Sequence, residues 1–319
     1  MQSIAQIKEV CVLGGSGFVG SSIVTRLDAA GFQVKVLTRR RESAKHLLLL
    51  PNVRVIECNV LDYKALNREL RGADAVINLL GILHQSRRNT FNLIHQQLPA
   101  QLAKICIDLN IKRLLHMSSL RADKDAPSHY LRSKAAGEAA LLAEKNRLNV
   151  TIFRPSVIFG RHDRFINLFA SMIKFLPVIL LAKPNAKFQP IWVEDVSACF
   201  LTSLENPTTY GQAYELAGPK VYTFRALIQE VMIVLQIQRP IIGLNDRLSY
   251  MQAFFMEWLP IKLMSRDNIR SMEVDSVCDM PFPAVFSRTP SALETVIPQY
   301  LVNQTSRGNY DRYRRHAAR

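Results

Sequence analysis

The sequence predicts an α/β protein with a doubly wound parallel sheet, helices on both faces of that sheet, and a smaller, mostly helical C-terminal lobe. In the first half of the 319 residues, short β-branched runs alternate with longer stretches whose apolar residues recur every three or four positions. Helices between successive strands favour parallel pairing through crossover connections. The expected strands are residues 10–13, 33–38, 53–58, 75–78, 114–117 and 150–154, and the expected helices are residues 19–29, 63–70, 97–108 and 134–145.

The second half of the chain has a different pattern. After residue 154 prolines recur and the strict alternation of strand and helix is lost, which indicates a second lobe. Residues 187–193 and 213–216 still have strand character and would return the chain to the sheet. We therefore expect a first domain over residues 1–160, with its sheet completed by residues 186–217, and a smaller lobe formed by residues 161–185 and 218–319.

Composition limits the classes of protein to consider. With 48% hydrophobic and 21% charged residues the chain is typical of a globular domain, and no apolar run reaches the ~18 residues of a membrane-spanning helix. The first residues lack the layout of a secretory signal, so we expect a cytoplasmic protein, either free or peripheral at the inner face of the membrane. The five cysteines are scattered, which predicts a reducing compartment and no metal site. The histidines are interpreted as packing or surface residues, namely His84, His95, His116 and His129.

The net charge of +15 favours polyanions, anionic membrane surfaces or acidic proteins as partners. The sequence has no zinc-finger, helix-turn-helix or aromatic RNP signature, so we expect no nucleic acid. Residues 248–264 are rich in aromatic side chains, with cations on either side. Four alternatives stay open for this segment: core packing, the wall of an apolar substrate cavity, a protein-docking surface, or contact with a membrane interface.

A glycine-rich turn gives the first functional signal. Residues 14–20 read G-x-x-G-x-x-G between an expected strand and an expected helix. Glycines there allow a tight turn and close approach of a pyrophosphate, while the helix start offers free N–H groups to the anion. Residues 1–160 are therefore interpreted as a dinucleotide-binding domain of the Rossmann type. The expected contacts from this turn are Gly14, Ser16, Gly17, Phe18, Val19 and Gly20.

The end of the second expected strand indicates which dinucleotide is bound. An NAD site places an acidic residue here, about twenty residues after the turn, to bind the ribose hydroxyls. This chain instead has Arg39 and Arg40, whose guanidinium groups can pair with a 2′-phosphate. The sequence therefore favours NADP(H), with NAD(H) as the alternative.

A Y-x-x-x-K pattern, Tyr130 to Lys134, begins a helix and follows Ser118 and Ser119 at the end of a strand. Together with the glycine turn, this pattern resembles the short-chain dehydrogenase/reductase superfamily. The resemblance implies that Tyr130 transfers a proton, that Lys134 lowers the pKa of Tyr130 and holds the nicotinamide ribose, and that Ser118 or Ser119 polarises the substrate oxygen.

Further motifs extend the resemblance along nearly the whole chain. Residues 59–62, 78–81 and 154–160 match the family's adenine-contact, fourth-strand and sixth-strand motifs. They imply further cofactor contacts from Asn59, Val60, Leu79, Gly81, Pro155 and Val157.

Residues 130–138, 159–165 and 189–197 resemble an atypical branch of the superfamily, which includes the nucleotide-binding accessory subunit of mitochondrial respiratory complex I and its bacterial homologues. The best-known member of that branch is regarded as holding NADPH for structural reasons. Two features differ from the sugar-nucleotide epimerases: Asn59 replaces an aspartate, and Tyr130 follows Ser119 by only eleven positions.

Two function classes follow from these motifs. The first is a nucleotide-holding protein with a structural or redox-sensing role at a partner complex, which the branch resemblance favours. The second is an NADP(H)-dependent oxidoreductase, or an epimerase or dehydratase, that uses Tyr130 and Lys134. Whether these two residues turn over a substrate stays open. A cluster of charged residues after the sixth strand either contacts an anionic ligand or forms internal ion pairs, and comprises Arg154, Arg161, His162, Asp163 and Arg164.

Overall fold

The computed structural model describes residues 7–258 and 264–302. The chain divides into two compact units that exchange segments along the sequence. Unit 1 comprises Met1–Pro155, Val193–Leu216 and Met280–Arg288, and unit 2 comprises Ser156–Trp192, Ala217–Asp279 and Thr289–Arg319.

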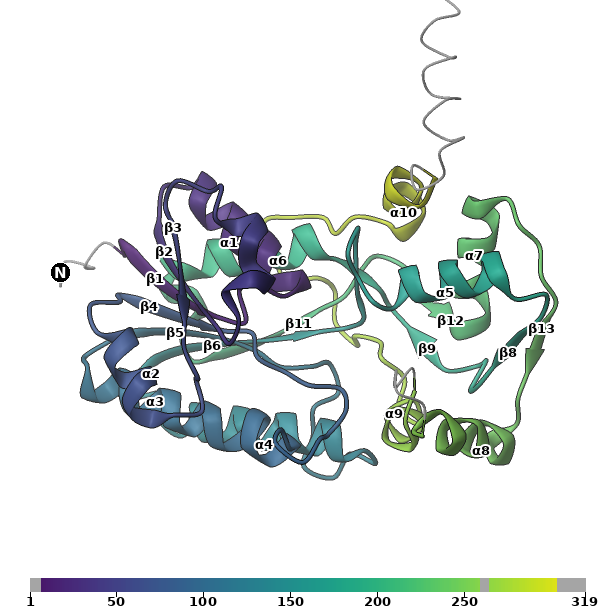
Figure 1. The fold of residues 1–319 in the computed structure, drawn as a ribbon, viewed down its shortest axis with the longest axis horizontal. Coiled ribbons are helices and arrows are strands. Elements are labelled where there is room, and N and C mark those ends of the chain that lie inside the picture. Colours follow the sequence, from purple (N-terminus) through teal and green to yellow (C-terminus); the bar gives the residue numbers. More distant parts are fainter. Residues whose placement is uncertain (1–6, 259–263, 303–319) are drawn as a thin grey trace, which may run out of the picture. The chain divides into compact units, whose positions relative to one another are not determined.

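Unit 1 is built on a seven-stranded parallel sheet with the strand order β11-β6-β5-β4-β1-β2-β3 (Figure 1). All six strands expected from the sequence are present, and the seventh, β11, pairs in parallel with β6. The order reverses at β1, which is the crossover pattern of a doubly wound sheet. The strands are β1 (Glu9–Leu13), β2 (Gln33–Thr38), β3 (Val53–Glu57), β4 (Ala75–Asn78), β5 (Arg113–Met117), β6 (Asn149–Pro155) and β11 (Gln212–Leu216).

Helices cover both faces of this sheet, as the sequence predicts. Figure 1 shows α1 (Phe18–Ala29) and α6 (Val193–Leu204) on one face, with α2 (Tyr63–Leu70), α3 (Leu98–Asp108) and α4 (His129–Leu142) on the other. A π-helical segment, η2 (Asn92–Gln97), leads directly into α3. The short 3-10 segments of unit 1 are η1 (Arg41–Leu47), η3 (Pro207–Thr209) and η4 (Ala284–Phe286).

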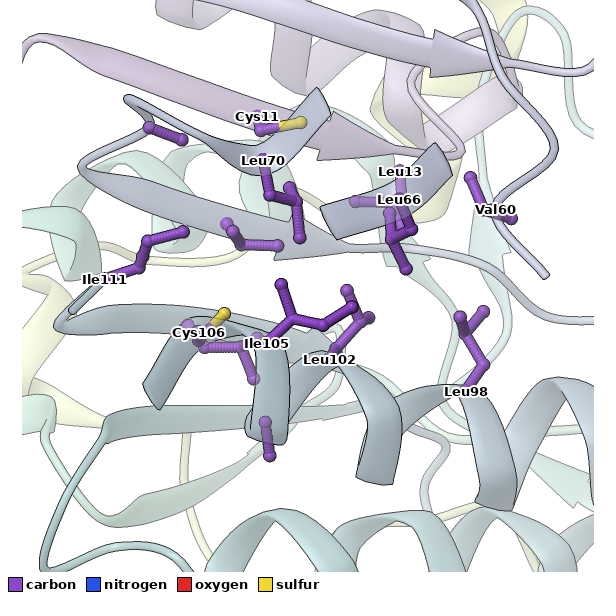
Figure 2. Close-up of a cluster of buried hydrophobic side chains, with 14 of the residues drawn as sticks. Cys11, Leu13, Val60, Leu66, Leu70, Leu98, Leu102, Ile105, Cys106 and Ile111 are labelled. Atoms are coloured by element: carbon purple, nitrogen blue, oxygen red, sulfur yellow. The ribbon is translucent and has the colours of Figure 1, made fainter. Parts of the chain in front are cut away.

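A fully apolar layer joins the sheet to α2 and α3 (Figure 2). Leu66 and Leu70 of α2 and Leu98 and Leu102 of α3 are completely buried against the strands. Burying a leucine side chain contributes roughly 1.5–3 kcal/mol. This layer fixes the strands in one register, and their carboxyl ends therefore form a defined edge on which a ligand site can be built.

Unit 2 combines three two-stranded pairings with five helices in the described residues. The pairs are β7 (Ile158–Phe159) with β10 (Ile191–Trp192), β9 (Lys187–Phe188) with β12 (Tyr222–Thr223), and β8 (Ile179–Leu181) with β13 (Ile241–Gly243). The helices are α5 (Ile166–Phe175), α7 (Phe224–Leu235), α8 (Asp246–Met256), α9 (Arg266–Ser271) and α10 (Leu293–Leu301). Phe224 is fully buried and its ring contacts Phe165, Phe169 and Phe188.

The expectation of one strand over residues 187–193 is wrong. Gln189 and Pro190 interrupt it, because proline has no N–H to donate to a ladder. The two remaining pieces, β9 and β10, pair within unit 2 and do not enter the seven-stranded sheet.

In the described part of the aromatic segment, residues 248–258, the aromatic side chains are exposed, so core packing is wrong as the interpretation of this part. Helix α8 buries Ala253 and Ser249 but leaves Phe255 62% exposed, and Trp258 just after the helix is 79% exposed. Leu259 and Lys262, which the sequence placed in or beside this segment, lie outside the described residues. No helix in the described ranges is long and apolar enough to cross a membrane.

Candidate cofactor and catalytic site

The glycine turn lies between β1 and α1, where the sequence predicts it. Gly14 has a φ of +82°, a left-handed conformation that favours glycine. A Cβ on Gly20 would lie 2.2 Å from the Gly14 carbonyl oxygen, so Gly20 allows the first turn of α1 to pack on the loop. A Cβ built on Gly17 would have only the Gly14 carbonyl oxygen near it among the described residues, at 3.3 Å. Gly14 and Gly20 therefore shape the turn, while Gly17 leaves space above it.

The first turn of α1 offers N–H groups with no capping side chain. Gly17 is the N-cap residue and cannot supply a side-chain oxygen, and no acidic residue lies in the first turn. The N–H groups of Phe18, Val19 and Gly20 precede the first intrahelical bond, which Ser21 makes to the Gly17 carbonyl. Free N–H groups and the positive helix end are the features that bind a phosphate.

The two arginines after β2 are exposed at the edge of the sheet. Within the described residues neither Arg39 nor Arg40 forms an ion pair, so both guanidinium groups are available to an anion. Ser16 of the glycine turn lies near Thr38 at the end of β2, with 3.4 Å between their hydroxyl oxygens. The glycine turn and the two arginines that follow Thr38 therefore lie at the same carboxyl edge of the sheet.

The register between β2 and β3 adds a carboxylate that the sequence pattern did not reveal. Glu57 at the end of β3 lies opposite Thr38 in the ladder and accepts a hydrogen bond from the Arg41 N–H at 3.4 Å. A negative charge is thus present beside the arginine run. It would act against a 2′-phosphate, whereas Arg39 and Arg40 would attract one.

The predicted adenine and β4 segments also lie at the carboxyl ends of their strands. Asn59 is exposed just after β3, and its Oδ1 accepts the Leu61 N–H at 3.2 Å, while Val60 is buried. Leu79 follows β4 and donates its N–H to the Leu13 carbonyl at 3.0 Å. A Cβ on Gly81 would lie 3.2 Å from the Lys134 Nζ, so the loop after β4 approaches α4 closely at this point.

Tyr130 lies in the first turn of α4, and its side chain is hydrogen-bonded to Ser119. The structure therefore brings together Tyr130 and Ser119 of the two candidate serines. Ser118 is buried, and its hydroxyl has no partner within the described part of the chain. Ser119 is thus the serine that faces the Tyr130 hydroxyl.

Burial raises the pKa of Tyr130, and the hydrogen bond with Ser119 acts in the opposite direction. Lys134 is almost fully buried, and burial lowers the pKa of its ammonium to about 8, with Glu138 acting against that shift. The ammonium donates to the Met117 carbonyl oxygen at 3.0 Å. Burial and Ser119 are the causes of the shift in the pKa of Tyr130, and Lys134 is not among them, so the expected effect of Lys134 on Tyr130 stays a prediction.

One member of the predicted charged cluster, Arg154 near the end of β6, forms an internal ion pair. Arg154 donates to both carboxylate oxygens of the buried Glu138, with Nε at 3.0 Å from each, so this arginine is not free for an anionic ligand. In unit 2, Asp163 accepts N–H bonds from Gly160, Phe165 and Ile166 and thereby organises its loop. The charges of Arg154 and Asp163 are therefore both used by contacts within the protein.

His95 and His116, interpreted from the sequence as packing or surface residues, are both buried, and each makes polar contacts that the sequence did not reveal. His116 of β5 contacts Asn78 of β4 at 3.1 Å between Nδ1 and Nδ2, and lies opposite it in the ladder. His95 is hydrogen-bonded to Ser133 of α4 and to the Ile82 N–H. The sequence gave no sign of either role, because each partner is thirteen or more positions away.

Two predicted cofactor contacts that are close in sequence, Pro155 and Val157, belong to different units. Pro155 ends β6 in unit 1, where its carbonyl accepts the Leu120 N–H at 2.9 Å. Val157 is half-buried and belongs to unit 2. No group of three His, Cys, Asp or Glu side chains in residues 7–258 and 264–302 is arranged to hold a metal ion.

These features fit a dinucleotide with its pyrophosphate at the glycine turn. The space above Gly17, the uncapped N–H groups of α1 and the exposed arginines all lie at one edge of the sheet, and Tyr130 and Lys134 begin the helix after β5. A doubly wound sheet with this turn and a tyrosine–lysine pair defines the class: a dinucleotide-binding α/β protein of the short-chain dehydrogenase/reductase kind.

Comparison with known proteins gives the family. The chain belongs to the NAD dependent epimerase/dehydratase family, whose model matches residues 10–217. It is 32% identical over 225 residues to the mitochondrial NADH dehydrogenase (ubiquinone) 1 alpha subcomplex subunit 9 of Dictyostelium discoideum, covering 69% of this chain and 62% of that protein. It is 27% identical over 318 residues to the mitochondrial NADH-ubiquinone oxidoreductase 40 kDa subunit of Neurospora crassa, covering 94% and 80%.

The chain spans about three fifths of the length of the Dictyostelium relative. Among solved structures, UDP-glucose 4-epimerase of Thermotoga maritima with UDP-glucose is similar in fold, with a TM-score of 0.72 at 16% identity over 93% of this chain and 99% of that one. These comparisons confirm the α/β fold and the resemblance to complex I subunits predicted from the sequence.

Proposed function

We propose that this chain holds NADP(H) at the glycine turn and serves as a nucleotide-containing subunit of a partner complex. The observation that carries the cofactor part is the end of β2, where two exposed arginines replace the acidic residue of an NAD site. The relatives that are subunits of NADH dehydrogenase support the partner part. We place the protein in the cytoplasm, in peripheral contact with the inner face of a membrane through that partner.

The choice of NADP(H) is tested by removing the arginine charges. Replacing Arg39 and Arg40 together by alanine should weaken NADPH binding by about tenfold or more and leave NADH binding within about twofold, because only NADPH carries the 2′-phosphate. Arg41→Ala is the matched control and should have a smaller effect. Glu57→Gln should shift the NADPH to NADH affinity ratio in the opposite direction. An unchanged ratio in the double variant would refute the assignment.

The partner part is supported by the exposed aromatic side chains of α8 and the residues that follow it. Phe255 and Trp258 are largely exposed, and Tyr250 and Phe254 lie beneath the guanidinium of Arg266 at 5.9 Å and 5.2 Å. Exposed aromatic groups with a neighbouring cation are enriched at protein interfaces. We assign this face of unit 2 to contact with a protein of the partner complex.

This surface is tested by sedimentation with isolated respiratory membranes and with protein-free anionic vesicles. Binding to the membranes alone, lost in a Phe255→Ser, Trp258→Ser variant, supports a protein partner. Binding to both, weakened by salt over a Debye length of ~10 Å at 0.1 M, would replace the protein partner by the lipid surface. Failure to bind either would contradict a role at a membrane complex.

A second candidate function is catalysis. The observation that favours it is the hydrogen bond between Tyr130 and Ser119, beside a buried Lys134. A bound nicotinamide would supply or accept a hydride. Ser119 would then orient the substrate oxygen, and Tyr130 would pass a proton to or from that oxygen. A net change in nicotinamide absorbance with any compound of a broad carbonyl panel, or conversion of any sugar nucleotide detected by chromatography, would support this candidate. Neither result across the panels would favour the subunit role.

A further inference from the structure

His95 connects two predicted parts of the cofactor site that are distant in sequence. Its Nε2 accepts the Ile82 N–H at 3.0 Å, and its Nδ1 lies 2.8 Å from the Ser133 hydroxyl. Ser133 in turn donates to the Tyr130 carbonyl at 2.7 Å. Because the Ser133 hydrogen is used there, its oxygen must accept from His95, so the imidazole carries its proton on Nδ1. The result is a continuous chain of hydrogen bonds from the loop after β4 to the first turn of α4.

The surroundings hold the imidazole in one orientation. Its ring stacks on Phe91 at 5.3 Å between centroids and meets the Tyr130 ring edge-on at 5.5 Å. A Cβ on Gly137 would lie 1.9 Å from the His95 carbonyl oxygen, so α4 packs directly on this segment. His95 lies in the π-helical turn η2, and π-helical turns occur frequently at functional sites.

Burial keeps the imidazole neutral. Desolvation lowers the pKa of His95 to about 2, and the nearby Lys134 ammonium acts in the same direction. The charged and titratable groups that shift this pKa are Lys134 and His116, and neither is a carboxylate that would favour protonation. At neutral pH the ring therefore both donates and accepts, as the two hydrogen bonds require.

We propose that His95 is a positioning residue that fixes the 79–82 loop to α4 and so preforms the half of the site that receives the nicotinamide ribose. This inference rests on the proposed NADP(H) function. Leu79 and Gly81 are expected cofactor contacts in this loop, and the Gly81 backbone approaches Lys134, the residue expected to hold the ribose. Without the bridge the loop must be ordered when the cofactor binds, and that cost lowers affinity.

The test compares NADPH with adenosine 2′,5′-bisphosphate, which contains the adenosine and the 2′-phosphate but no nicotinamide ribose. His95→Phe keeps the ring and removes both hydrogen bonds. It should weaken NADPH binding by about tenfold and leave the bisphosphate within about twofold. His95→Gln can return an acceptor to the Ile82 N–H and should recover part of the loss. Phe91→Leu, a packing change without a lost hydrogen bond, is the matched control and should not change the ratio of the two affinities.

Each outcome decides one question. If His95→Phe binds NADPH as tightly as wild type, or loses both ligands equally, His95 is not a positioning residue although the protein still binds the cofactor. If wild type binds neither ligand, the proposed function fails and the inference fails with it. Should His95→Phe not fold, Ser133→Ala removes the α4 end of the bridge while keeping the imidazole. It should also weaken NADPH more than the bisphosphate, and an unchanged ratio of the two affinities would overturn the inference.

Discussion

Replacing Lys134 by methionine should make the cofactor-free protein more stable, although it removes a predicted site residue. The Lys134 side chain is 4% exposed, and burial lowers its pKa from 10.5 to about 8. At ~1.4 kcal/mol per pKa unit, this shift costs the folded state about 3 kcal/mol at pH 7. The methionine at position 134 cannot make the hydrogen bond to the Met117 carbonyl, and this loss reduces the gain in stability by about 1 kcal/mol. The expected net gain is about 2 kcal/mol.

The pH dependence gives the sign of the effect. The folded pKa of Lys134 lies below its unfolded value, so the unfolded chain binds more protons between pH 8 and 10.5. Wild-type stability should therefore rise with pH across that window, as the destabilisation by the buried ammonium is relieved. At pH 9.5 the free-energy cost of burying Lys134 falls to about 1 kcal/mol, so Lys134→Met should no longer be more stable than wild type.

Urea denaturation of wild type and Lys134→Met at pH 7 and pH 9.5 measures this effect. The gap in the free energy of unfolding should shrink by about 2 kcal/mol between the two pH values. The same variant should bind NADPH at least about tenfold more weakly, because it lacks the ammonium expected at the ribose. If the variant is less stable than wild type at pH 7, by an amount that does not change with pH, the buried ammonium does not destabilise the folded protein.

Three further predictions follow from the described contacts. Tyr130→Phe should leave NADPH affinity within about twofold and lower any turnover by about a hundredfold or more, and a substrate still converted at the wild-type rate would move the chemistry elsewhere. Arg113→Met should lower the free energy of unfolding by about 3 kcal/mol or more. Burial lowers the pKa of the 2% exposed guanidinium to about 10, at a cost of about 3 kcal/mol, but this loss is outweighed by hydrogen bonds of roughly 1.5–3 kcal/mol each to the Leu204, Asn149 and Ser203 carbonyls and to the Thr151 and Thr209 hydroxyls. Denaturation checks that value, and unchanged stability would contradict it. Gly20→Ala should disrupt α1 as judged by circular dichroism, since its Cβ would meet the Gly14 carbonyl at 2.2 Å, and a stable, folded variant would show that the turn can move.

The features that could be predicted from the sequence are those that local pattern determines. The glycine turn and the strands of the first half depend on residues within one element or between neighbouring elements. The helix expected over residues 134–145 starts five residues earlier in the structure, at His129. The Y-x-x-x-K spacing places Tyr130 and Lys134 on one side of α4 because residues four apart in a helix are neighbours.

The features that could not be predicted depend on contacts between distant segments. Glu57 enters the edge near Arg41 only through the register of β2 with β3. His95 reaches Ser133, thirty-eight positions later, only because α4 packs on η2. The Lys134 ammonium is directed to the Met117 carbonyl by the fold of β5 and α4. No periodicity along the chain encodes these three contacts.

The placement of the cofactor at the glycine turn is tested most directly by titrating wild type and Gly17→Val with NADPH at equilibrium and following nicotinamide fluorescence. A Cβ at Gly17 meets only the Gly14 carbonyl, at 3.3 Å, so the variant should keep the wild-type circular dichroism spectrum while its side chain fills the space expected for the pyrophosphate. Wild type should bind NADPH saturably, and the folded variant should bind it about a hundredfold or more weakly. Wild-type affinity in a folded Gly17→Val protein would contradict the placement of the cofactor at this turn.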